Sequence, residues 1–173
     1  GETAIIDGAV ALDSGSFTKP AADDAIAARI KDSTARENVL VYDLSGLNIN
    51  YDEQQAVYYG GSRALEARYP NDGYVMGFDS LSGKTFYDTS NVVGTWAEPV
   101  GVKIIGMFEI DWASSDGIIS SYDSSSNRVT VSTSSSLSYN SGRYYYANVI
   151  EEMDMVGEYY IDEETETLYF YAP

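Results

Sequence analysis

Short runs in which apolar and polar residues alternate, separated by turn-forming residues, fill most of the chain after residue 38. The run from Val39 to Leu44 alternates in this way and stops at Ser45-Gly46. A period of two is typical of a strand that buries one face. The same pattern predicts further strands at 55–59, 65–69, 73–76, 84–87, 102–110, 117–122, 128–133, 144–149, 159–162 and 167–171. Many short strands with turns between them favour an antiparallel sandwich or barrel.

Two pairs of these strands form hairpins by their sequence. Residues 118–122 and 128–132 flank an Asp/Ser/Asn turn, and residues 158–161 and 167–171 flank an acidic turn at 162–166. Alternation on both arms of each hairpin fixes which side chains face the core.

The region before residue 39 has a different pattern. Residues 4–12 are apolar and β-branched with a glycine break, which predicts a short strand. After Pro20, the acids Asp23 and Asp24 precede an alanine-rich stretch that ends at Arg29 and Lys31, an order of charges that suits a helix. We therefore predict a mainly β fold, a single antiparallel β-sandwich or barrel-like domain over residues 1–173, with one short α-helix near residues 20–31.

Charge and composition narrow the classes of partner. The 173 residues include 10 Lys and Arg against 27 Asp and Glu, a net charge of −17, which repels nucleic acids and anionic membranes. We therefore expect no nucleic-acid and no membrane partner. With no His and no Cys, the chain lacks the commonest general base, thiol nucleophiles and the usual zinc ligands. The acidic turns 123–127 and 162–166 lack the spacing of a calcium loop, so we expect neither a metal nor a cofactor.

Paired carboxylates are the first candidates for chemistry in so acidic a chain. Glycoside hydrolysis needs two of them about 5 to 10 Å apart. On a strand, Glu109 and Asp111 would share one face roughly 7 Å apart, with Phe108 and Trp112 on the other. Glu151, Glu152 and Asp154 form another acidic group. Ordinary surface charge is the favoured explanation, because 27 acids produce such pairs by chance.

Aromatic side chains are the second candidates, because their flat faces stack on sugar rings while nearby polar groups bind hydroxyls. Three consecutive tyrosines, Tyr144 to Tyr146, must point to both faces of a strand, so they cannot all be core. The candidates are Trp96, Trp112, Tyr69, Tyr74, Tyr144, Tyr145 and Tyr146, although packing is the commoner role for any one tyrosine.

Several segments resemble those of a known protein class. The stretches 143–154, 157–162 and 167–173 are similar to a segment of bacterial secreted right-handed parallel β-helix proteins. In those proteins the segment reads approximately R-Y-Y-V-E-N-x-L-E-E-L-D-x-P-G-E-W-Y-L-D-x-x-T-G-T-L-Y-Y-x-P. Residues 67–73 and 106–113 resemble that class's A-R-[YW]-P-N-x-G and G-Y-W-x-x-D-W-A. Ala147 and Val156 depart from the pattern, where Glu and Pro are usual.

The resemblance implies a function as well as a fold. Such proteins include glycoside hydrolases, β-xylosidase-like enzymes among them, and polysaccharide-lyase-like relatives, with a β-sandwich inserted into the early rungs of the β-helix. Residues 1–12 would then end one rung, and the catalytic carboxylates would lie on the β-helix of the parent protein. The resemblance therefore implies a secreted or cell-surface bacterial protein.

We expect a non-catalytic accessory domain of a carbohydrate-active protein, with the β-helix of the same parent chain and a polysaccharide or oligosaccharide as partners. The candidate ligand-binding residues are Arg68, Tyr69, Asn71, Asp111 and Trp112, which could equally form the surface that docks on the β-helix. Three alternatives stay open: an autonomous carbohydrate-binding module, a self-contained glycosidase using Glu109 and Asp111, and a structural or adhesin spacer.

Overall fold

The computed structural model describes residues 9–51, 55–137 and 142–173, and in these ranges the fold is mainly β with antiparallel sheets, as predicted. The strands are β1 (Leu40–Asp43), β2 (Tyr58–Tyr59), β3 (Ser62–Arg63), β4 (Leu65–Glu66), β5 (Arg68–Tyr69), β6 (Val75–Met76), β7 (Asp79–Ser82), β8 (Thr85–Tyr87), β9 (Lys103–Met107), β10 (Ser115–Asp123), β11 (Arg128–Ser132), β12 (Arg143–Ala147), β13 (Glu158–Asp162) and β14 (Thr167–Phe170). The helical segments are α1 (Ser33–Asn38) and the 3₁₀ turns η1 (Ser14–Ser16), η2 (Ala27–Arg29), η3 (Val93–Thr95) and η4 (Ile150–Glu152). No helix in the described ranges is long and apolar enough to cross a bilayer, and α1 has only six residues.

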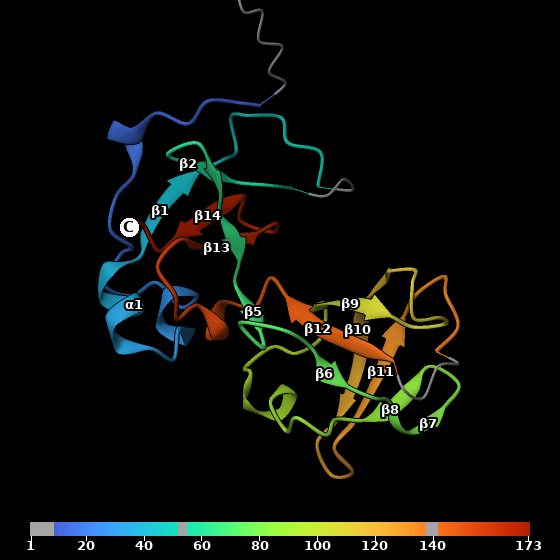
Figure 1. Ribbon diagram of the computed structural model, residues 1–173. Helices are drawn as coiled ribbons and strands as arrows, with labels where there is room; N and C mark the ends of the chain where they lie inside the picture. Colours follow the sequence, from blue (N-terminus) through green and yellow to red (C-terminus); the bar gives the residue numbers. More distant parts are fainter. Residues whose placement is uncertain (1–8, 52–54, 138–141) are drawn as a thin grey trace, which may run out of the picture.

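The strands form two main sheets that lie side by side (Figure 1). One has four strands in the order β1-β14-β13-β4. The other has eight, in the order β5-β12-β9-β10-β11-β8-β7, with β6 also paired to β12. The short strands β2 and β3 pair only with each other, although Tyr59 of β2 has its ring centroid 5.6 Å from that of Phe170 on β14.

The helix of the N-terminal region lies later in the chain than the charge order predicts. Asp24 accepts hydrogen bonds from the backbone N–H groups of Ile26 and Ala27, which starts only the short turn η2. Ile30 then adopts an extended ψ of 118° and is fully buried, so the turn ends there. Asp32 caps a new helix by accepting from Ala35 N at 2.7 Å, and α1 follows.

Most predicted strands are present, and both predicted hairpins are confirmed with their expected turns. The predicted strand 65–69 is two strands, β4 and β5, which belong to different sheets and join at the buried Ala67. The predicted strand 102–110 ends at Met107, while β3 and β7 were not predicted. Of the predicted strand 4–12, residues 1–8 lie outside the described ranges and residues 9–12 are not in a strand.

The eight-stranded sheet curls over its own hydrophobic core. Phe86 on β8 and Tyr144 on β12 have ring centroids 5.3 Å apart, although the sheet order places β8 four strands away from β12. In a flat sheet, four strand spacings would hold these residues about 19 Å apart. The curled sheet therefore encloses its core in the manner of a sandwich or barrel. This core is made of Phe78, Phe86, Val92, Val93, Trp96, Val102, Ile104, Phe108, Ile119, Val129, Val131, Leu137, Tyr144, Tyr146 and Val149.

The four-stranded sheet buries both of its faces. Along β14, Leu168 and Phe170 face one hydrophobic cluster, while Tyr169 and the following Tyr171 face another. The second cluster includes Ile30 and other residues of the 27–39 region, so the helical segments cover that face. The alternation along β14 thus explains why a strand with so few polar residues is stable here.

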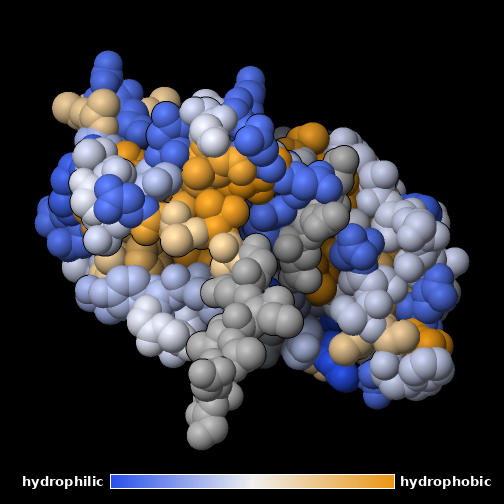
Figure 2. Space-filling model, turned by 90° about the horizontal axis from the view of Figure 1, so that it is seen from above, coloured by the Kyte–Doolittle hydropathy of each residue, from blue (hydrophilic) through white to orange (hydrophobic). Residues whose placement is uncertain are grey.

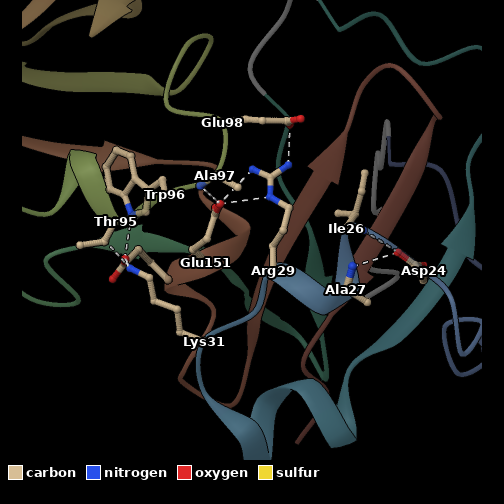
Figure 3. A network of polar contacts seen from close by, with 11 residues as sticks. Asp24, Ile26, Ala27, Arg29, Lys31, Thr95, Trp96, Ala97, Glu98 and Glu151 are labelled. Carbon is tan, nitrogen blue, oxygen red and sulfur yellow. Dashed lines mark hydrogen bonds and ion pairs between the residues drawn. The ribbon is translucent and has the colours of Figure 1, made fainter. Parts of the chain in front are cut away.

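A polar network connects the helical region to the loop after η3 (Figure 3). The Glu151 carboxylate is nearly fully buried and accepts from Arg29 Nε at 3.0 Å and from Ala97 N at 2.8 Å. Arg29 also reaches Glu98 at 2.6 Å. Beside them, Glu152 Oε1 accepts from Lys31 Nζ at 2.6 Å and from the Trp96 indole at 2.8 Å. These contacts join elements whose hydrophobic side chains belong to different cores.

The half of the molecule with the four-stranded sheet exposes more hydrophobic surface than the other half when viewed from above (Figure 2). Side chains that are only partly buried against the cluster on one face of this sheet include Leu12, Leu47, Ile49 and Val57. We call these four residues the apolar surface. Its hydrophobic side chains are not fully covered by the described chain.

The packing of β9 on β12 predicts a sensitive position at Gly106. A Cβ built on Gly106 would lie 2.2 Å from Arg143 O and 2.7 Å from Tyr144 Cα, both backbone atoms. Because backbone cannot yield as a flexible side chain can, we expect Gly106→Ala to lower the free energy of unfolding by at least about 2 kcal/mol in urea titrations. Gly46 has no atom within 4 Å of its built Cβ, so Gly46→Ala is the matched control and should change stability little. Equal stability of the two variants would contradict this packing.

Candidate functional site

The outward face of β12 carries the candidate site. Tyr144 and Tyr146 are fully buried in the core, so the alternate residues Arg143 and Tyr145 point outward. This arrangement confirms that the three consecutive tyrosines divide between the two faces. Directly paired residues of neighbouring antiparallel strands share a face, and Ala147 pairs with Arg68 of β5. Arg68 therefore lies on the same outward face as Tyr145.

The backbone of the loop after β5 holds Arg68 in place. Its Nε donates to Pro70 O at 2.8 Å and its Nη2 donates to Gly73 O at 2.7 Å. The centre of its guanidinium lies 3.8 Å from the centroid of the Tyr145 ring, a cation–π contact. The peptide bond between Tyr69 and Pro70, in the same loop, is cis. Arg68 is thus fixed by two carbonyl groups and one aromatic ring.

The row of outward side chains continues from Tyr145 to the turn after β9. Tyr145 and Tyr74 have ring centroids 5.9 Å apart, and the Arg143 guanidinium lies 5.5 Å from the Tyr74 ring. Arg143 in turn donates to Asp111 Oδ1 at 2.5 Å, next to Trp112, which is 83% exposed. We call the row Arg68, Tyr145, Tyr74, Arg143 and Asp111, together with the neighbouring Trp112, the tyrosine–arginine strip.

The strip contains some of the residues that the sequence predicted and omits others. Arg68, Asp111 and Trp112 belong to it. Tyr69 does not, because it turns inward and packs against the large core. Asn71 lies in the loop whose carbonyl groups bind Arg68. Its side chain is not part of the strip, because it donates to Asp154 Oδ1 at 2.7 Å.

Arg143 is the member of the strip that sequence reasoning missed. It stands two residues before Tyr145, so the period of two on β12 places both on one face. Tyr74 and Tyr145 were among the aromatic candidates, but nothing in their sequence positions paired them. Trp96, another candidate, is buried in the core with its indole bonded to Glu152.

The Tyr145 side chain is a neutral phenol at neutral pH. Burial raises the pKa of Tyr145, the positive charge of Arg68 lowers it by less, and the nearby Glu66 raises it further. A tyrosine with a pKa above its usual value of 10 keeps its proton at neutral pH. Its ring is thus a stacking and hydrogen-bonding group rather than a base.

The carboxylate pair Glu109 and Asp111 does not have the geometry that a strand would give it. Both residues follow the end of β9 at Met107, in an irregular turn, where Phe108 is fully buried and Trp112 is exposed. Glu109 Oε1 accepts from Ser136 N at 2.6 Å, and Asp111 is bonded to Arg143. Each carboxylate therefore has a structural partner in the fold.

A pocket in the N-terminal region lies outside the strip. The pocket has a volume of about 300 Å³ and lies against residues 19–37, with Lys19, Asp24, Arg36 and Glu37 among its lining residues. It lies apart from the strip and contains no aromatic side chain. Among residues 9–51, 55–137 and 142–173, no three Asp or Glu side chains lie close enough together to hold a metal ion.

Glu158, at the start of β13, is a buried carboxyl group with a raised pKa. It is fully buried, its Oε2 accepts from the N–H groups of Asp154 and Met155 at 2.8 and 2.9 Å, and its Oε1 has no partner within the described residues. Burial raises the pKa of Glu158 to about 7, against the opposing effect of the two backbone hydrogen bonds. Because it caps the turn 154–157 and lies away from the strip's contacts, its shift reflects a structural role.

A pH dependence of stability follows from Glu158. Its pKa in the folded protein is above the usual 4.5, so the folded state holds the proton more tightly than the unfolded state does. Stability should therefore fall as pH rises from about 4.5 to 7, by up to about 3 kcal/mol from this group. Urea unfolding at pH 5 and pH 8 should show that Glu158→Gln removes this part of the slope, while Glu164→Gln, at an exposed acid, retains it. Identical slopes for wild type and Glu158→Gln would refute the assignment.

Comparison with known proteins adds one likeness at the level of fold. No family model and no curated protein matches the chain. A solved structure described as "Glycoside hydrolase" superposes with a TM-score of 0.60 over 79% of this chain, at 14% sequence identity. The chain shares its fold with part of a glycoside hydrolase. It spans 26% of that structure's length, so the likeness concerns one portion of a much longer chain.

Proposed function

We propose that this chain is a non-catalytic accessory unit of a larger carbohydrate-active protein and that the tyrosine–arginine strip binds saccharide. The observation that carries the proposal is the strip itself, an outward row of aromatic rings with polar groups held between them. Flat rings stack on the apolar faces of sugar rings, and the neighbouring guanidinium and carboxylate groups bind hydroxyls. The fold likeness to part of a glycoside hydrolase supports the carbohydrate connection.

The non-catalytic part of the proposal rests on the carboxylates near the strip. A retaining or inverting glycosidase needs two carboxyl groups that face each other across a substrate. Asp111 instead forms an ion pair with Arg143, and Glu109 accepts a backbone hydrogen bond from Ser136. The chemistry of the parent protein would then reside in another domain.

The apolar surface supports a second partner, the remainder of the same parent protein. Its hydrophobic side chains are only partly covered, and the similar structure is about four times as long as the matched portion. We propose that this partner is a parallel β-helix of a secreted or cell-surface bacterial protein, as the sequence resemblance implies. The apolar surface would pack on it, and the strip on the other sheet would remain open to saccharide.

Binding of saccharide by the strip can be measured in affinity gels and by calorimetry with xylan and pectin. Trp112→Ala and Tyr74→Ala should each weaken binding about ten-fold, the effect of losing roughly 1.4 kcal/mol of stacking. Tyr58 is 64% exposed on β2 and outside the strip, so Tyr58→Ala is the matched control and should bind as the wild type does. Equal loss in all three variants, or no binding by the wild type, would overturn a role for the strip.

The accessory role makes a separate prediction about the gene. The coding sequence around this chain should encode the rungs of a parallel β-helix, and the isolated chain should not hydrolyse aryl glycosides. Hydrolysis by this chain unaided, lost in Asp111→Asn, would contradict the role and favour the glycosidase alternative. Flanking sequence that encodes no further domain would favour an autonomous binding module.

A further inference from the structure

Arg68 is a guanidinium that the fold positions but does not neutralise. The chain has 27 acids, yet none of the described ones lies within ion-pair distance of Arg68. Its partners are two backbone carbonyl groups and the Tyr145 ring. Uncharged partners fix the side chain in one orientation and leave its positive charge available.

The geometry of these hydrogen bonds leaves one edge of the guanidinium open. A guanidinium has five N–H donors in a planar fork. Nε and Nη2, on one edge, bind Pro70 O and Gly73 O. The remaining pair of N–H groups on Nη1 and Nη2 makes no hydrogen bond to the described residues, and such a pair matches the two oxygens of a carboxylate.

Two other cations of this face, Lys103 and Arg143, are already in ion pairs. Lys103 lies opposite Ala147 in the register of β9 and β12. Its Nζ lies 3.4 Å from Glu66 Oε1 and 3.6 Å from Glu163 Oε1. Arg143 is paired with Asp111 at 2.5 Å. The carboxylates of Glu66, Glu163 and Asp111 are thus each in contact with a cation other than Arg68. Near Tyr145, the positive charges of Arg68 and Arg63 act together with the negative charge of Glu66.

We infer that the strip recognises a sugar residue that carries a carboxylate, a uronic acid, with its carboxylate on the open edge of Arg68 and its ring against the neighbouring aromatic side chains. This inference rests on the proposed function and names the class of saccharide. A charged, bidentate hydrogen bond is stronger and more directional than one to a sugar hydroxyl. The net charge of −17 repels anions, but physiological salt screens the repulsion from charges more than about 8 Å away, so the groups next to Arg68 decide the local affinity.

The test compares two ligands that differ in their carboxyl groups, which are charged in one and neutral methyl esters in the other. Calorimetry in 0.15 M NaCl should show that the wild type binds trigalacturonate at least ten-fold more tightly than its fully methyl-esterified form. This comparison requires no substitution, so it does not depend on the folding of a variant. Equal affinity for the two would overturn the inference and leave saccharide binding intact, whereas binding of neither would overturn the proposed function as well.

Substitutions then locate the effect. Arg68→Gln should abolish the preference for the charged ligand, and Arg68→Lys should retain only part of it, because lysine keeps the charge without the fork. Arg36 donates to Ile30 O at 3.1 Å in the other half of the molecule, so Arg36→Gln is the matched control and should keep the full preference. A preference that survives in Arg68→Gln, or tighter binding of a sulfated disaccharide than of trigalacturonate by the wild type, would overturn the assignment.

Discussion

The close approach of β9 and β12 at Gly106 determines which residues the molecule shows to solvent. Only hydrogen occupies the space in which a Cβ would meet the backbone of Arg143 and Tyr144. Tyr144 and Tyr146 can therefore pack inward, where Tyr144 stacks on Phe78 with centroids 4.8 Å apart and Tyr146 meets Trp96 edge-on. Because successive side chains of a strand point to opposite faces, burial of these two rings places Tyr145 and Arg143 on the outward face. The strip is thus a consequence of core packing on the opposite side of the same strand.

The two sheets are joined in a different way, through polar contacts and a short crossing of the chain. The hydrophobic clusters of the four-stranded sheet and of the curled sheet do not share residues. The chain crosses between the sheets at Ala67, whose carbonyl accepts from Val149 N at 3.1 Å. The network around Glu151 adds charged hydrogen bonds that are directional and nearly removed from water. Removing one partner of such a buried group would leave an unpaired charge, so the network favours one relative placement of its elements.

Sequence patterns predicted what depends on local alternation and turn chemistry. Both hairpins are present because Asp123 and Asp162 accept hydrogen bonds from their own turns, a contact within three residues along the chain. The pattern could not show that residues 65–69 divide between two sheets, because the division depends on the distant partners Glu158 and Ala147. The helix was placed too early, because the order of charges around 20–31 did not reveal that burial of Ile30 ends the turn.

The same distinction explains where the structure places the candidate site residues. Arg68, Asp111 and Trp112 were predicted from residue type, but their connection runs through Tyr145, Tyr74 and Arg143, which only the pairing of strands brings together. The strand assumed for Glu109 and Asp111 ends at Met107, and this removed the geometry on which a catalytic pair depended. What remains on this face is a set of rings and two guanidinium groups, of which Arg68 is fixed by two backbone carbonyl groups and Arg143 by Asp111. Fixed groups of this kind bind a ligand without a large loss of their own conformational entropy, which suits recognition more than proton transfer.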